Sequence, residues 1–315
     1  VGFRNQAFGD GSADLASAKD ENFQSSRLRA VANERDCSPV CAAGKRPRSL
    51  LAAPPVWQRR CGIIHRMRRA HGNLTRIHVP ATLAPGAVVA LPSAAAHHLV
   101  HVLRAAVGDE VVVFRDGVEF AAAVARIDKH AVTVKLVSGQ AIDRETPLAC
   151  VLAQAISSGE RMDLTLQKAV ELGIADVQPL YSERSVVRLG AERAEKRIAH
   201  WQQVLIGACE QCGRNVIPAL TAPVPVIDWL GALPAASAGE LRVLLSPRAS
   251  TRLADLPRPR SVTLLAGPEG GFTAVEAELA QQRGFVALRL GPRVLRPETA
   301  ALATLAALNT LWGDF

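Results

Sequence analysis

Residues 267–272 read Gly-Pro-Glu-Gly-Gly-Phe, and residues 290–300 read Leu-Gly-Pro-Arg-Val-Leu-Arg-Pro-Glu-Thr-Ala. Each loop follows a short apolar stretch, 261–266 and 285–290, that has the length and composition of a buried strand. In open α/β sheets, ligands bind beyond the carboxyl ends of the strands. The two loops therefore predict an α/β sheet with a ligand site where these strands end.

Neither loop matches a common nucleotide-binding pattern. Residues 267–272 lack the GxGxxG spacing of dinucleotide sites and the Lys-Ser/Thr pair of triphosphate loops. Three glycines still allow backbone amides to approach a ligand closely and to adopt positive φ angles. One such loop is often only a turn, but a second glycine-proline loop that ends in Arg-Pro-Glu-Thr makes a much rarer combination.

Strand and helix patterns alternate around these loops. Strand patterns cover 148–156, 174–181, 241–246, 261–266 and 285–290, and helix patterns cover 159–172, 191–212, 273–283 and 297–311. Thr273 and Glu276 form a capping box, and Pro297 occupies a favourable first-turn position. This alternation predicts an α/β domain with a largely parallel sheet.

A β-rich region precedes this domain. Residues 97–104 predict a short helix with Leu99, Val102 and Leu103 on one face, and Asp116-Gly117 is a strong hairpin signal. Strand patterns cover 110–114, 118–127 and 131–137, before a polar linker at 138–146. Short strands this close together predict a small barrel-like domain.

The net charge of +8 lies almost entirely in the first quarter of the chain. Residues 1–73 hold 13 Lys/Arg against 6 Asp/Glu, whereas residues 74–315 hold 24 against 23. Residues 1–72 show no sustained periodicity and bury too little apolar surface to offset their ordering entropy. We expect a disordered extension or a translated upstream region, because Met67 is the first methionine. A basic RNA-binding tail is the alternative.

Composition excludes several classes of protein. Apolar residues make up 49% and charged residues 21%, as in soluble globular chains, and no apolar run is long enough to span a membrane. Six cysteines are too sparse for a disulfide framework, which predicts a reducing, cytoplasmic location. The Cys209-Glu-Gln-Cys212 motif ends a helical pattern and has no second ligand pair, so we predict helix packing and no metal.

Residues from about 74 to 315 resemble the RsmE-type methyltransferases, which methylate N3 of a uridine in small-subunit ribosomal RNA. The matching segments occur in order at residues 102–104, 108–109, 158–162, 167–173, 182–184, 208–214, 267–271 and 290–300. The resemblance implies a SPOUT-class domain with a deep trefoil knot at 143–315, preceded by a PUA-like RNA-binding domain at 73–142. It also implies S-adenosylmethionine as cofactor, small-subunit ribosomal RNA as partner, and a homodimer with its active site near the interface.

The resemblance further implies a cofactor pocket formed by eight residues: Leu245, Gly267, Glu269, Gly270, Gly271, Leu290, Gly291 and Leu295. Arg296 would hold an RNA phosphate or a uracil carbonyl, Glu298 is the candidate base, and Arg214 would reach the substrate across the dimer. Arg104 and Lys129 would contact the RNA backbone. Each residue also has a structural alternative. Arg296 could pair with Glu298, and Glu298 could be an acid that stabilises the start of a helix. Arg214 could interact with the dipole at a helix end, and Arg104 and Lys129 could be ordinary surface residues.

The expected reaction is S-adenosylmethionine-dependent methylation of uridine N3, without a metal. Two alternatives stay open, because specificity depends on the site and not on the fold. One is an RNA-binding or ribosome-assembly protein on an inactive SPOUT scaffold. The other is a methyltransferase that acts on another RNA base.

We predict that residues 1–66 are dispensable, since their sequence lacks the pattern of a folded domain. A chain that begins at Met67 should keep the thermal midpoint and the methylation rate of the full chain. A large loss in either quantity would show that the segment is a working domain.

Overall fold

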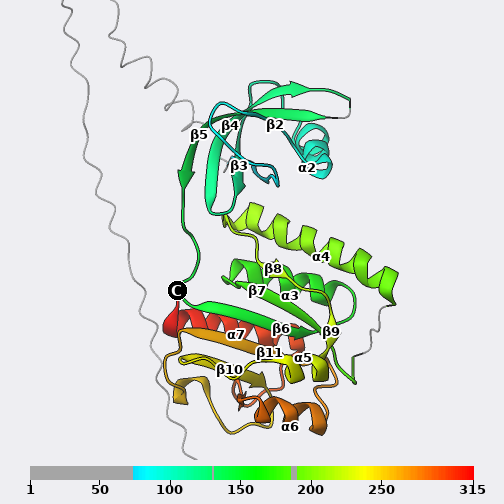
Figure 1. Ribbon diagram of the computed structural model, residues 1–315, viewed down its shortest axis with the longest axis vertical. Helices are drawn as coiled ribbons and strands as arrows, with labels where there is room; N and C mark the ends of the chain where they lie inside the picture. Colours follow the sequence, from blue (N-terminus) through cyan, green and yellow to red (C-terminus); the bar gives the residue numbers. More distant parts are fainter. Residues whose placement is uncertain (1–73, 130, 186–189) are drawn as a thin grey trace, which may run out of the picture. The chain divides into compact units, whose positions relative to one another are not determined.

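The computed structural model describes residues 74–129, 131–185 and 190–315 (Figure 1). The predictions for residues 1–72, including the significance of Met67, lie outside the described residues. Among the described residues, no helix is both long and apolar enough to cross a membrane.

The first sheet has the strand order β1-β3-β4-β5-β2, with β1 parallel to β3 and the other pairs antiparallel. Asp116 and Gly117 have φ angles of 48° and 83°, so the predicted hairpin turn between β3 and β4 is confirmed. The apolar core of this sheet includes Val113, Val134 and Leu136. Its elements are β1 (Arg76–His78), β2 (Val88–Ala90), α2 (Ser93–His97), the π-helical turn η1 (His98–Val102), β3 (Glu110–Arg115), β4 (Val118–Ile127) and β5 (Val132–Ala141).

Two expectations for this region were wrong. Leu99 is buried as predicted, but Val102 and Leu103 are 60% and 46% exposed. The chain widens into the π-helical turn η1, so the 3.6-residue spacing that would place the three side chains on one face is lost. The linker expected from residue 138 also begins later, because β5 continues to Ala141 and pairs there with the start of β4.

The second sheet has the order β12-β10-β11-β6-β7-β8, with β9 also paired to β7, and every one of these pairs is parallel. The predicted parallel α/β architecture is therefore confirmed. Its elements are β6 (Ala149–Ala155), α3 (Glu160–Glu171), β7 (Asp176–Tyr181), α4 (Ala191–Cys212), β8 (Ala219–Leu220), β9 (Val224–Pro225), α5 (Val226–Ala232), β10 (Glu240–Leu245), the short 3-10 turn η2 (Leu253–Asp255), β11 (Ser261–Ala266), α6 (Ala274–Gln282), β12 (Phe285–Leu288) and α7 (Pro297–Trp312).

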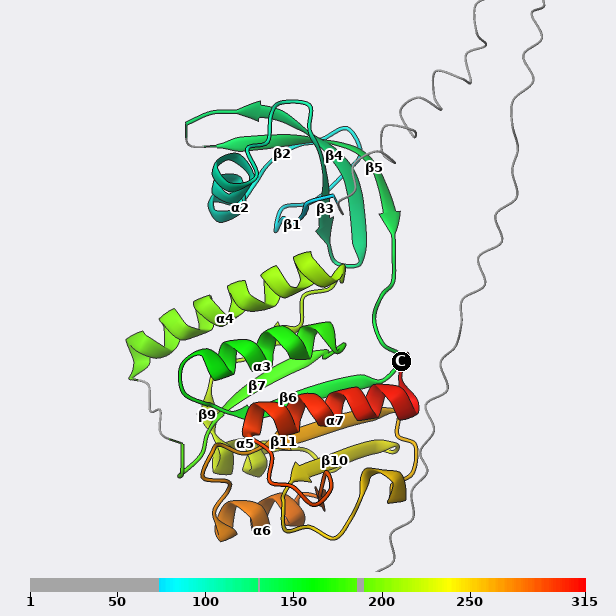
Figure 2. The ribbon, with the colours of Figure 1, turned by 180° about the vertical axis from the view of Figure 1, so that it is seen from behind.

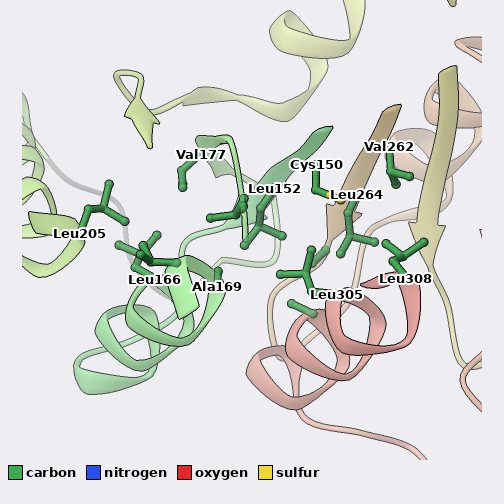
Figure 3. Close-up of a cluster of buried hydrophobic side chains, with 14 of the residues drawn as sticks. Cys150, Leu152, Leu166, Ala169, Val177, Leu205, Val262, Leu264, Leu305 and Leu308 are labelled. Atoms are coloured by element: carbon green, nitrogen blue, oxygen red, sulfur yellow. The ribbon is translucent and has the colours of Figure 1, made fainter. Parts of the chain in front are cut away.

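Helices cover both faces of the parallel sheet (Figure 2). Successive strand residues point to opposite faces, so Leu152 and Leu264 join a core with α3, α4 and α7, while Ala153 and Leu265 join a core with α5 and α6. Figure 3 shows side chains of α3 and α7 pointing towards those of β6 and β11. Burial on both faces explains why these strands are nearly continuous apolar runs.

The strand order determines where the loops meet. β10 pairs with β11 on one side and with β12 on the other. Because all three strands are parallel, the loops that follow them leave the same edge of the sheet. The trefoil knot that the resemblance implies stays a prediction.

Candidate active site

A cavity of about 530 Å³ lies at the carboxyl ends of β10, β11 and β12. Its size is that of a typical small-molecule site. Backbone and side chains of the three loops form most of its wall, and Arg184 from the turn after β7 completes it. The contributing segments are 244–248, 266–274, 288–290 and 293–295, with Ala277, Pro297 and Ala300 from the helices.

The cavity brings together the residues that the family resemblance predicts as a cofactor pocket. Its wall contains all of that set apart from Gly291: Leu245, Gly267, Glu269, Gly270, Gly271, Leu290 and Leu295. Gly291 has a φ of 91°, so it shapes the second loop without reaching the wall.

The glycines of the first loop serve different purposes. Gly271 has a φ of 67°, which side chains rarely tolerate. A Cβ on Gly267 would lie 3.2 Å from the Phe272 ring, and a Cβ on Gly270 would lie 3.2 Å from Cβ of Arg184. Of these three glycines, only Gly271 has the positive φ expected for the loop; Gly270 is instead required by the close approach of the turn after β7.

Hydrogen bonds to a buried carboxylate hold the turn after β7 against the start of α6. Glu276 is 3% exposed. It accepts hydrogen bonds from the Glu183 amide at 2.8 Å, from the Ser182 hydroxyl at 3.2 Å and from the Thr273 amide at 2.8 Å. The Thr273 hydroxyl in turn accepts a bond from the Glu276 amide. The capping box is confirmed, and the same carboxylate also joins two loops that are far apart in sequence.

Arg184 strengthens this junction from the other side. Its guanidinium donates to the carbonyl oxygens of Gly270 at 3.1 Å and of Phe272 at 3.4 Å. The turn after β7 therefore forms a wall of the cavity and at the same time holds the glycine-rich loop. A second cavity, of about 520 Å³, lies beside the same junction and is lined by residues 181–183, 225–227, 273, 275 and 276.

A further ion pair reaches the glycine-rich loop from the start of α3. Arg161 donates to Glu269 at 2.7 Å. Glu269 is a wall residue, so this contact both anchors the loop and neutralises a carboxylate of the cavity. Arg161 was not among the predicted site residues, although it lies in one of the matching segments.

The two residues proposed for chemistry flank the cavity without lining it. Arg296 is exposed and precedes the first turn of α7, between the wall residues Leu295 and Pro297. Glu298 is buried, and its Oε2 atom has no hydrogen-bond partner among the described residues. Within this part of the chain, Arg296 and Glu298 form no ion pair with each other.

Arg214 occupies a different environment from the predicted one. It is 4% exposed, and all three of its guanidinium nitrogens donate to protein acceptors. These acceptors are the Glu145 carboxylate and the carbonyl oxygens of Val170 and Ile174. The buried guanidinium thus ties the segment before β6 to the turn between α3 and β7. The structure thus gives Arg214 a packing role among the described residues, and its contact with the substrate across a dimer stays a prediction.

The remaining predicted positions lie outside the cavity wall. Arg104 and Lys129 are exposed, and Arg104 has a φ of 55°, a strained value for a residue with a side chain. Cys209 is fully buried at the end of α4, where burial raises the pKa of its thiol to about 12. The predicted packing role of Cys209 is confirmed by its place in the core.

Gly270→Val should weaken binding of S-adenosylmethionine, because the new side chain would displace Arg184 and reshape the cavity wall. Overpacking of this kind costs about 1–3 kcal/mol. If the whole cost destabilises the cofactor-bound form, the affinity falls roughly 5- to 150-fold. Calorimetry measures the affinity, with Gly207→Val as the matched control, since no described residue lies within 4 Å of a Cβ there. Normal affinity in Gly270→Val would exclude the loop from the binding site.

Glu276→Gln should lower both cofactor affinity and stability. A glutamine places an amide nitrogen where the carboxylate accepts bonds, which leaves a buried donor unpaired at a cost of about 1–3 kcal/mol. Glu278→Gln removes the same charge from an exposed site on the same helix and should change neither quantity. If Glu276→Gln lowers the thermal midpoint but leaves the affinity intact, the carboxylate only caps α6.

Comparison with known proteins places this geometry in a family. The model of an RNA methyltransferase domain matches residues 144–309, and that of an RNA methyltransferase PUA domain matches residues 91–137. Ribosomal RNA small subunit methyltransferase E from Buchnera aphidicola (subsp. Schizaphis graminum) is 33% identical over 244 residues, which span 77% of this chain and 98% of that protein. The predicted pairing of a PUA-like domain with a methyltransferase domain is thus confirmed.

Two solved structures have the same fold along their whole length. A putative methyltransferase from Legionella pneumophila in complex with S-adenosylmethionine is 41% identical, with a TM-score of 0.74 over 78% of this chain and 100% of that one. Ribosomal RNA small subunit methyltransferase E from Neisseria gonorrhoeae, bound to S-adenosylmethionine, is 39% identical, with a TM-score of 0.71 over 77% and 100%. The chain therefore belongs to the family of RNA methyltransferases that includes ribosomal RNA small subunit methyltransferase E.

Proposed function

We propose that this protein transfers the methyl group of S-adenosylmethionine to N3 of a uridine in small-subunit ribosomal RNA. The observation that supports this most strongly is the cavity at the ends of β10, β11 and β12, because both glycine-proline loops of the family resemblance contribute to its wall. The proposal also rests on relatives that align with this chain over nearly their whole length.

The wall of the cavity suits S-adenosylmethionine. Leu245, Leu290 and Leu295 supply apolar surface, and Gly267, Gly270 and Gly271 line the wall with backbone alone, because they have no side chain. A Cβ at Gly267 or Gly270 would crowd its neighbours, so the approach of a ligand to this backbone depends on glycine. When bound, the cofactor supplies the electrophilic methyl group.

The rest of the chemistry falls to residues beside the cavity. Uracil N3 is protonated at neutral pH, so it must lose its proton before or during the attack on the methyl carbon. The enzyme must therefore hold the base in line and stabilise the imide anion that develops on the two carbonyl oxygens. Arg296 is exposed next to two wall residues and free of any ion pair in the described part of the chain, which suits a contact to such an oxygen.

Glu298 is the candidate proton acceptor. It is buried in the first turn of α7, and one of its carboxylate oxygens has no hydrogen-bond partner in the described region. Its position in the first turn also favours any acid electrostatically. The two roles differ in what a Glu298→Gln variant would do to the pH dependence of the reaction.

The wider assignment completes the proposal. We assign residues 73–142 to the PUA-like domain, with Arg104 and Lys129 as backbone contacts to RNA, and 143–315 to the methyltransferase domain. The family resemblance supports a homodimer whose interface lies near the active site, and a substrate of this kind places the protein in the cytoplasm.

Mass spectrometry of small-subunit ribosomal RNA tests the activity. RNA from cells that lack the protein should have lost one N3-methyluridine, and the purified protein with S-adenosylmethionine should restore it. Loss of a different methylated base would assign another specificity, and an unchanged RNA would support the inactive-scaffold alternative.

Single-turnover kinetics test the chemical roles. The rate should rise with pH until the ionising group is saturated. Arg296→Ala should lower the saturated rate about 100- to 1,000-fold, as for a lost oxyanion donor, with cofactor affinity nearly unchanged, and Arg296→Lys should recover part of it. If Glu298 accepts the proton, Glu298→Gln flattens the low-pH limb. Weaker RNA binding in Arg296→Ala at an unchanged saturated rate would make Arg296 a phosphate contact instead.

A further inference from the structure

Three arginines on the cavity wall have no protein partner for their side chains within the described residues. Arg248 follows β10, whereas Arg289 and Arg293 follow β12. All three are exposed. The Arg289 amide donates to the Thr251 carbonyl and the Arg248 amide to the Ser246 hydroxyl, but no hydrogen bond or ion pair is formed by the three guanidinium groups in this part of the chain.

The other charged groups of the wall are already satisfied. Arg184 donates to two carbonyl oxygens of the glycine-rich loop. Glu269, the one carboxylate that the described residues contribute to the wall, is paired with Arg161. The three free guanidinium groups therefore give this edge of the sheet an uncompensated positive charge. Since residues 74–315 are almost neutral as a whole, this charge is a local concentration.

The cofactor does not explain this concentration. S-adenosylmethionine has a cationic sulfonium and an amino-acid end whose charges cancel, so a strongly positive wall opposes its binding on balance. One arginine could hold its carboxylate, but three from separate parts of two loops exceed that need. Guanidinium groups match phosphate oxygens in a bidentate geometry, and unpaired arginines beside a site for a nucleotide are suited to a phosphate backbone.

We propose that Arg248, Arg289 and Arg293 form a phosphate-binding site on the rim of the cofactor cavity, which holds the RNA backbone next to the target nucleotide. This proposal rests on the proposed function and specifies which residues of the catalytic domain bind the RNA substrate. Because the residues belong to the same loops as the cofactor wall, phosphates held there would place the neighbouring base over the cavity. The Arg161–Glu269 pair keeps the nearby carboxylate from competing with the phosphates.

Salt dependence of RNA binding tests the site. Each neutralised phosphate contributes about 0.7 (single strand) to 0.9 (duplex) to the slope of log affinity against log salt concentration. Binding of the full-length protein to a small-subunit ribosomal RNA transcript is measured at salt concentrations from about 50 to about 200 mM, where affinity depends strongly on salt. The variants are Arg248→Gln, Arg289→Gln, Arg293→Gln and the triple variant. Arg258→Gln is the matched control, because Arg258 is exposed and outside the wall.

Each single variant should lower the magnitude of the slope by about 0.7–0.9, and the triple variant by about 2 to 3. Calorimetry with S-adenosylmethionine distinguishes this role from a contact to the cofactor, and Arg258→Gln should change neither the slope nor the cofactor affinity. An unchanged slope in the triple variant overturns the proposal. If that variant also loses cofactor affinity, the arginines hold the methionine carboxylate.

These measurements are independent of catalysis. RNA binding is measured without cofactor, so the slopes decide the role of the three arginines even if the methylated base differs from the proposed one. Failure of the proposed function would instead appear in the mass spectrum, as loss of another base or of none.

Discussion

The pairing of β10 with both β11 and β12 is the constraint on which the candidate site depends. All three strands are parallel, so their carboxyl ends lie side by side and their loops leave one edge of the sheet. Neither glycine-proline loop could form the cavity alone, because each supplies only part of its wall. Any change that separated β12 from β10 would dismantle the site even if every wall residue were kept.

A buried carboxylate gives this arrangement its second support. Glu276 begins as a helix cap, a local role visible in the sequence, and also accepts bonds from Ser182 and Glu183. The turn after β7 is thereby held against the glycine-rich loop, and Arg184 and Gly270 meet there with no room for a larger residue. Local capping and the construction of the cavity are thus coupled through one side chain, which is buried without a cationic partner among the described residues.

The elements were largely predictable, whereas the contacts between them were not. Apolar pattern and turn chemistry located β4 and α4 to the residue, because those signals are local. A π-helical turn exposed Val102 and Leu103, which no spacing rule anticipates. Arg214 looked available for substrate because its partners, Glu145 among them, lie far away in sequence. Three-dimensional pairing decides whether an arginine is free. The sequence therefore could not distinguish Arg293, which has no side-chain partner among the described residues, from the buried Arg214.

Hydrogen exchange of the full-length protein, with and without S-adenosylmethionine, tests most directly whether the three-loop cavity is the cofactor site. Binding there should slow exchange of amides in 267–273 and 289–295 and leave 225–227, beside the second cavity, unchanged. Protection centred on 225–227 and on residues 181–183, with none at 267–273, would show that the cofactor binds in the second cavity instead.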